Sequence, residues 1–160
     1  MTLARSKPRP EDEVRELERA AYDRDFYTWT LQQAALIREG RFAEIDRENV
    51  AEEIEALGRS EFAQFVSFLQ LILLHMLKWD HQPERRTRSW RLSIVLHRDH
   101  AKTVLDENPG FKSRLGEALA RAYRRARLDA MKETKLPSST FPEVCPYSLE
   151  ETLERFFSTD

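Results

Sequence analysis

The residues best suited to chemistry gather at the end of one apolar stretch of the sequence. His75 precedes Lys78 by three positions and Trp79 by four. On a helix, this spacing places the three side chains within about one turn of each other. An imidazole, an ammonium and an indole would then emerge together from the end of a buried helix. Such a group can bind an anion, or transfer protons where burial shifts its pKa values.

Carboxylates that could face this group lie upstream. Glu48, Glu52 and Glu55 are spaced four and three positions apart, which puts them in a row on one helix face. The candidate pocket combines these glutamates as bases or ligands, His75 as a proton shuttle, two cations that hold an anionic group, and an indole cap. Its members are Glu52, Glu55, His75, Lys78, Trp79, Arg85 and Trp90. The alternative, which we favour, is a hydrogen-bonded core histidine and a solvated row of glutamates.

The sequence favours neither a metal site nor a cofactor site. The Glu-x-x-His pattern of di-iron bundles is missing. His97 and His100 are three positions apart but are expected on different faces of their helix. Cys145 lies between Val144 and Pro146 with no base beside it, and the four glycines are isolated from each other. We therefore expect no metal and no cofactor, and assign no catalytic residue.

The charge distribution suggests a different function. Residues 78–127 hold 13 Lys or Arg against six Asp or Glu, a net charge of +7, whereas residues 1–77 hold 10 against 15, a net charge of −5. A basic face beside Trp79 or Trp90 could bind the phosphates of RNA or DNA and stack a base. The candidate phosphate-binding residues are Arg86, Arg88, Arg91, Arg121, Arg124 and Arg125. Alternatively, this basic half pairs with the acidic half, within one chain or between two copies.

Composition narrows the fold class to helices. The 160 residues are 41% hydrophobic and 34% charged, with four glycines and one cysteine. Few glycines argue against a many-stranded β sandwich or barrel, and a single thiol can form neither a disulfide framework nor a Cys-based zinc site. Ala, Leu, Glu and Arg fill the long segments and favour helices.

Apolar periodicity predicts an all-α antiparallel bundle of four to five main helices, with an extended, Pro-containing C-terminal arm and a short terminal helix. Residues 1–10 are predicted to form a disordered tail, and residues 11–160 a single helical domain. We expect Gly40 to end the first helix and Gly58 to separate the second from the third. The predicted helices span residues 11–38, 43–57, 60–79, 84–107, 111–135 and 149–156.

Residues 62–77 carry no acidic or basic side chain, yet these 16 positions fall short of the roughly 20 that span a bilayer. Polar residues recur along this segment at steps of three or four, which is typical of a central helix in a bundle. No apolar run follows the basic N-terminus, so a secretory signal is not expected. We predict a cytoplasmic protein without a membrane partner.

Four segments, in order along the chain, carry a family resemblance. They are Tyr22 to Trp29, Glu52 to Glu61, His75 to Trp79 with Gln82-Pro83 and Ser89-Trp90, and Phe141-Pro142 to Cys145-Pro146-Tyr147. Together they resemble the bacterial family catalogued as domain of unknown function 29. The resemblance implies a small cytoplasmic helical protein and implies no activity, cofactor or catalytic residue. Family members tend to close with an acidic segment, whereas this chain has Glu154-Arg155-Phe156-Phe157.

The function therefore stays unknown at this level, and three hypotheses remain. We favour a non-enzymatic helical interaction or assembly module that binds itself, as a homodimer, or binds another protein. The second hypothesis is a nucleic-acid-binding protein that uses the basic face of residues 78–127. The third is a small-ligand or metal-binding enzyme with the Glu/His/Lys pocket.

Overall fold

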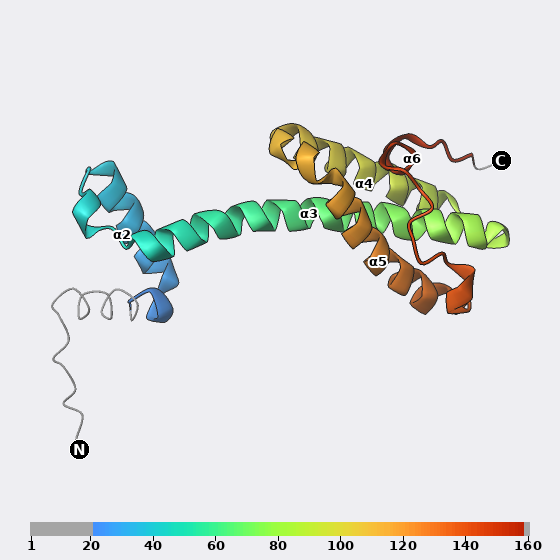
Figure 1. Cartoon of the computed structure of the whole chain (residues 1–160), viewed down its shortest axis with the longest axis horizontal. Coiled ribbons are helices and arrows are strands. Elements are labelled where there is room, and N and C mark those ends of the chain that lie inside the picture. The colour runs from blue at the N-terminus through green and yellow to red at the C-terminus, as the bar shows by residue number, and fades with distance from the viewer. Residues whose placement is uncertain (1–20, 159–160) are drawn as a thin grey trace, which may run out of the picture. The chain divides into compact units, whose positions relative to one another are not determined.

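The computed structural model describes residues 21–158, and every regular element in that range is a helix. The main elements are α2 (Phe26–Arg38), α3 (Arg47–His81), α4 (Arg88–Glu107), α5 (Leu115–Thr134) and the short α6 (Leu149–Glu154) (Figure 1). The all-α prediction is confirmed. The predicted tail of residues 1–10 and the first ten residues of the predicted helix 11–38 lie outside the described residues.

The chain groups into two compact units, residues 1–58 and 59–160. In unit 1, α2 begins after Asp25, whose carboxylate accepts a hydrogen bond of 3.0 Å from the Thr28 amide. The helix therefore restarts at Asp25. Gly40 follows its last turn with φ of +71°, a left-handed conformation that glycine adopts without strain. The predicted helix end at Gly40 is confirmed.

The predicted break at Gly58 is wrong, because α3 runs without interruption from Arg47 to His81. Gly58 has no positive φ, so it continues the helix. A glycine inside a helix costs about 1 kcal/mol relative to alanine, which helix formers on both sides can offset. Ile54 and Leu57, two large apolar residues beside Gly58, are exposed on this helix. The helix begins at Arg47 because the Asp46 carboxylate accepts a hydrogen bond from the Asn49 amide.

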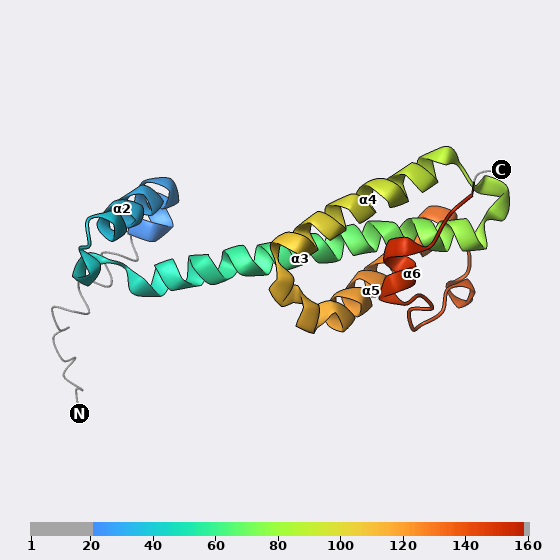
Figure 2. The ribbon, with the colours of Figure 1, turned by 90° about the horizontal axis from the view of Figure 1, so that it is seen from above.

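The core of unit 2 surrounds the second half of α3. Its fully buried side chains are Phe65, Val66, Leu69, Ile72, Leu73, Met76 and Leu77. They lie on one broad face of the helix, and α4, α5 and the C-terminal segment pack against α3 (Figure 2). The central helix predicted from residues 62–77 is therefore confirmed as the core of this unit.

Among the described helices, α3 is also long and apolar enough to cross a membrane by length and composition. Half of its most apolar 18-residue window is buried within the protein, as is usual for the core helix of a bundle. A cytoplasmic location and the lack of a membrane partner remain predictions.

The other helices differ from the expected ones mainly at their starts. Pro83 begins a 3₁₀ turn, and α4 starts later, at Arg88, where the Thr87 hydroxyl caps it. A second 3₁₀ turn over residues 109–114 delays α5 to Leu115. A capping box between Ser148 and Glu151 fixes the start of α6.

The C-terminal arm is fastened to α5 and α4 through its backbone carbonyls. The Tyr123 hydroxyl donates a hydrogen bond of 2.6 Å to the Pro142 carbonyl. Arg98 of α4 donates hydrogen bonds to the carbonyls of Glu151, Thr152 and Arg155, at 2.7 to 3.1 Å. The arm is extended where it passes α5, as predicted, and the hydrogen bonds to Pro142, Thr152 and Arg155 satisfy carbonyls that no helix ladder pairs.

Candidate functional site

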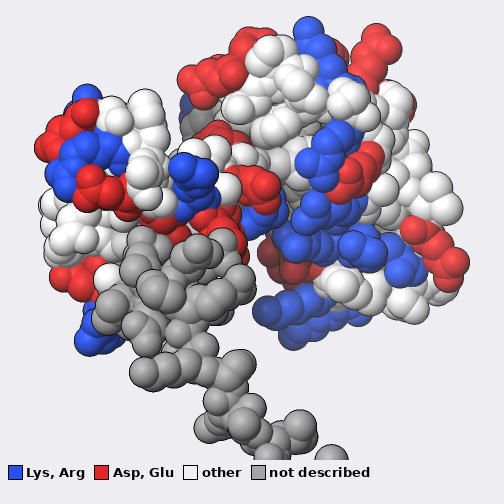
Figure 3. All heavy atoms as spheres, turned by 60° about the vertical axis from the view of Figure 1, so that its left-hand side comes forward, with Lys and Arg blue, Asp and Glu red and all other residues white. Residues whose placement is uncertain are grey.

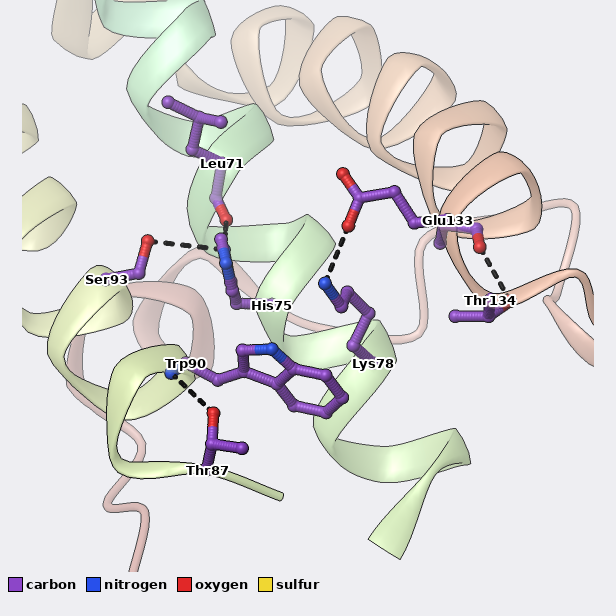
Figure 4. A network of polar contacts seen from close by, with 9 residues as sticks. Leu71, His75, Lys78, Thr87, Trp90, Ser93, Glu133 and Thr134 are labelled. Carbon is purple, nitrogen blue, oxygen red and sulfur yellow. Dashed lines mark hydrogen bonds and ion pairs between the residues drawn. The ribbon is translucent and has the colours of Figure 1, made fainter. Parts of the chain in front are cut away.

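His75 lies near the C-terminal end of α3 and faces α4 (Figure 4). Its Nδ1 is 2.8 Å from the Leu71 carbonyl, which can only accept, so Nδ1 carries the proton. The other ring nitrogen, Nε2, keeps a lone pair and has no partner in the described structure. Burial lowers the pKa of His75, and the nearby Lys78 charge lowers it further, against the opposing effect of the Leu71 hydrogen bond. His75 is therefore neutral at pH 7.

Lys78 links three helices. Its Nζ lies 2.6 Å from Oε2 of Glu133 on α5, and 4.6 Å from the ring centre of Trp90 on α4. The side chain of Lys78 is only 12% exposed. The ammonium is thus held between a carboxylate and an aromatic face, both of which stabilise a cation. Figure 4 shows the three side chains converging beside His75.

Ser93 extends the group on α4. Its hydroxyl oxygen lies 3.4 Å from Nδ1 of His75 and 3.2 Å from Nδ1 of His97. His97 repeats the arrangement of His75, since its Nδ1 is 2.7 Å from the carbonyl four residues earlier. Both rings are therefore oriented by their own helices. In residues 21–158, no three His, Cys, Asp or Glu side chains lie close enough together to hold a metal ion.

The structure brings together only part of the predicted pocket. His75, Lys78 and Trp90 form one cluster, but Glu52 and Glu55 belong to unit 1 and stand on the same uninterrupted helix as His75. The expectation that two helices present these residues to each other is therefore wrong. The carboxylate that does reach Lys78 comes from Glu133, which sequence reasoning missed.

The two remaining members of the predicted pocket have other surroundings. Trp79 is buried and packs edge-on against Phe157, with ring centres 5.5 Å apart. Its carbonyl accepts a hydrogen bond from Arg86, whose guanidinium lies 5.2 Å from the indole ring centre. Arg85 is exposed in the turn before α4 and contacts none of the cluster. Trp79 thus anchors the C-terminal segment.

Some of the predicted phosphate-binding arginines are held by other groups of the protein, and others are not. Arg86 is fixed by Trp79, and Arg121 pairs with Glu117 at 3.4 Å. Within residues 21–158, three of the six make no hydrogen bond or ion pair and are exposed: Arg88, Arg124 and Arg125. Arg91 has a buried Nε without a partner. Figure 3 shows basic side chains gathered on one side of unit 2.

A hollow of about 370 Å³ lies in unit 1, away from every predicted site residue. It is lined by Ala21, Arg24, Asp25, Thr28, Trp29 and Gln32. In the same unit, the indole of Trp29 donates a hydrogen bond of 3.2 Å to the buried Asp46 carboxylate. Gln33 accepts a hydrogen bond of 2.9 Å from the Asp46 amide. These polar contacts join α2 to the start of α3.

A family model described as Domain of unknown function DUF29 matches residues 21–158. The chain belongs to this family. No curated protein and no solved structure matches the chain.

In this DUF29 chain, the segments that carry the resemblance supply contacts that hold the fold together. Tyr22 donates a hydrogen bond to the Glu53 carboxylate, which raises the pKa of Tyr22 to about 12. Tyr147 donates a hydrogen bond of 2.8 Å to Asp80. Burial raises the pKa of Cys145, so its thiol stays protonated at neutral pH. These roles are structural.

Sequence reasoning missed the cluster of Asp80, Tyr147 and Arg155. Arg155 forms two hydrogen bonds of 2.7 Å with the Asp80 carboxylate. Burial would raise the pKa of Asp80, but the hydrogen bonds from Arg155 and Tyr147 outweigh it and hold the pKa below its ordinary value. Tyr147 belongs to one of the four segments that carry the family resemblance. Its hydrogen-bond partner in this DUF29 protein, Asp80, is evident only in the folded chain.

Proposed function

We propose that this DUF29 chain is a non-enzymatic interaction module that binds a protein partner through the outer side of α4. One observation supports the proposal. Leu92, Val95 and Leu96 are spaced three and one positions apart and are 47%, 54% and 52% exposed. Three large apolar side chains therefore share one turn of the helix and project away from the core.

The opposite side of α4 explains why this helix can present such a face. Ile94, Ala101 and Val104 are buried against the rest of unit 2. Arg98 is fixed by the carbonyls of α6 and the residue that follows it, and Lys102, seven positions after Val95 on the same stripe, pairs with Glu154 at 2.6 Å. The helix is thereby held before any partner binds, which lowers the entropic cost of binding. An amphipathic helix with a second apolar face suits helix-to-helix recognition.

The three apolar side chains would supply part of the free energy of binding. Full burial of a Leu or Val side chain stabilises a complex by about 1.5–3 kcal/mol. These side chains are already about half covered, so each contributes roughly half of that amount or less. An exposed apolar cluster of this kind is typical of a protein-binding surface.

Site-directed photocrosslinking in living cells tests the proposal. A photoreactive amino acid at position 95 is expected to form covalent adducts with a polypeptide, and Leu96→Glu should remove most of them. The matched control carries the same amino acid at position 120, where an exposed Ala lies on α5. The proposal is overturned when position 95 yields no more adduct than position 120, or when Leu96→Glu leaves the adducts unchanged.

A second candidate function is binding of a nucleic-acid backbone. Arg124 and Arg125 support it, because they are adjacent, exposed and without a partner in the described structure. Fluorescence anisotropy with single- and double-stranded oligonucleotides should show binding that weakens steeply with salt. Arg124→Glu combined with Arg125→Glu should abolish the signal, whereas Arg38→Glu in unit 1 should not. The lack of any signal at low salt and micromolar protein would exclude this function.

A further inference from the structure

The outer side of α4 carries a seam with the spacing of a coiled coil. Arg88, Leu92, Val95 and Asp99 follow each other at steps of four, three and four, and all four are exposed. Steps of four and three keep residues on one stripe of a helix. The seam therefore has two apolar residues at its centre, a cation at one end and an anion at the other.

The seam is complementary to the same seam on a second copy of α4 that runs in the opposite direction. A point midway between residues 93 and 94 is equidistant from Leu92 and Val95, and also from Arg88 and Asp99. A two-fold axis through this point lays a second α4 antiparallel to the first. Leu92 of one copy then faces Val95 of the other, and Arg88 faces Asp99. An isologous interface needs this kind of self-complementarity.

We propose that the partner of this face is a second copy of the same chain, bound as an antiparallel α4–α4 pair. The inference rests on the proposed function, because it names the partner of the same surface. Two equivalent Arg88 to Asp99 ion pairs close the ends of the seam, and four apolar side chains fill its centre. Leu96 lies on one flank of the centre, on the same side of the pair as Leu96 of the other copy.

The charges available on α4 favour this occupant. Arg88 and Asp99 make no hydrogen bond or ion pair in residues 21–158, so both are free to pair between copies. A parallel arrangement would place like charges together at both ends of the seam. A lipid surface or a nucleic acid would repel Asp99, which stands in the middle of the helix. Only a partner with the reversed charge order matches both ends.

The fold leaves room for this arrangement. The C-terminal segment reaches α4 at Arg98 and at Lys102, which follows Asp99 by three positions and continues the seam, so the unoccupied part of the seam ends at Asp99. Leu92, Val95 and Leu96 stay 47%, 54% and 52% exposed, so no described segment of the chain covers them. Pairing of one 20-residue helix lies at the low end of interface sizes, so we expect a dissociation constant of about 1–100 µM.

Charge reversal tests the register directly. Sedimentation of the full chain up to about 300 µM should show a monomer–dimer equilibrium. Arg88→Asp alone and Asp99→Arg alone should each weaken self-association about tenfold or more, because each faces like charges at both ends. An equimolar mixture of the two variants should associate again, because every contact in the mixed pair then joins opposite charges. Arg125→Asp on α5 is the control with the same change of charge.

The outcomes separate the two proposals. A wild-type chain that stays monomeric up to about 300 µM, or a mixture that fails to associate, overturns the paired α4 helices. If adducts from position 95 then identify another polypeptide, the interaction module stands and only its partner changes. If self-association survives Arg88→Asp and Asp99→Arg unchanged, the copies meet elsewhere and the inference is wrong. Circular dichroism confirms that each variant stays helical.

Discussion

Asp80, near the end of α3, accepts two hydrogen bonds of 2.7 Å from Arg155, which stands 75 positions later in the chain. The same carboxylate accepts a third from the Tyr147 hydroxyl at 2.8 Å. One carboxylate therefore fixes both ends of α6 against the central helix. Arg98 holds α6 from the side of α4, because its guanidinium donates hydrogen bonds to the carbonyls at the C-terminal end of α6.

Asp80→Asn is expected to lower the free energy of unfolding by about 1–2 kcal/mol. The variant loses the ion pair and one of the hydrogen bonds to Arg155. Removing one partner of a fully buried ion pair costs more, but the Asp80 and Arg155 side chains are 25% and 34% exposed, so water compensates in part. Urea unfolding monitored by circular dichroism measures the change. Glu107→Gln, an exposed substitution on α4, is the control and should have no effect.

His75 is expected to make unfolding dependent on pH between about 5 and 7. Its pKa is lowered in the folded chain, chiefly by burial, and is near 6.5 in the unfolded chain. The unfolded state therefore binds more protons in this range, and stability falls as the pH falls. The ring also lies near Lys78, Glu133 and His97, which face it from three helices.

NMR titration of the His75 ring protons should give a midpoint below 6.5, and His75→Gln should flatten the dependence of unfolding free energy on pH. A midpoint at or above 6.5 contradicts the neutral, buried state of this ring. A flat profile for the wild-type chain between pH 7 and pH 5 would do the same.

Lys78 and Glu133 should show a measurable coupling energy. A double-mutant cycle with Lys78→Gln and Glu133→Gln is expected to give about 0.5–1 kcal/mol, since Glu133 is partly solvated. Lys78→Gln should cost more than Glu133→Gln, because it also removes the cation above the Trp90 ring. Lys132→Gln, next to Glu133 and exposed, is the matched control. Additive single effects would show that the ion pair contributes nothing.

The helices of this chain could be predicted because their determinants are local. The uncharged segment 62–77 and the left-handed Gly40 depend only on neighbours in the sequence, and both predictions are confirmed. The terminal capping box follows the same rule. The first residue of a helix is harder to predict when a proline precedes the helix. Pro83 and Pro109 begin 3₁₀ turns, so the α-helices that follow start several residues later.

The candidate site was predictable only on one helix at a time. His75 and Lys78 share a face of α3, and Trp90 lies at the start of the next helix, just after the loop. The sequence could therefore predict that these three side chains lie close together. The carboxylate partner could not, because Glu133 reaches Lys78 from 55 positions away through the packing of α5. Glu52 and Glu55 are equally suitable partners only if Gly58 breaks the helix, and a glycine with helix formers on both sides can either end a helix or continue it.

Gly58 and Gly40 should therefore respond to alanine in opposite directions. A Cβ at Gly58 meets no atom within 4 Å, and the residue has helical backbone, so Gly58→Ala should stabilise the chain by about 0.5–1 kcal/mol. Gly40→Ala should destabilise it by about 1 kcal/mol, because φ of +71° disfavours a side chain there. Thermal and urea unfolding of both variants, followed by circular dichroism, measures the two signs. A destabilising Gly58→Ala would mean that α3 bends at this position, as the sequence first suggested.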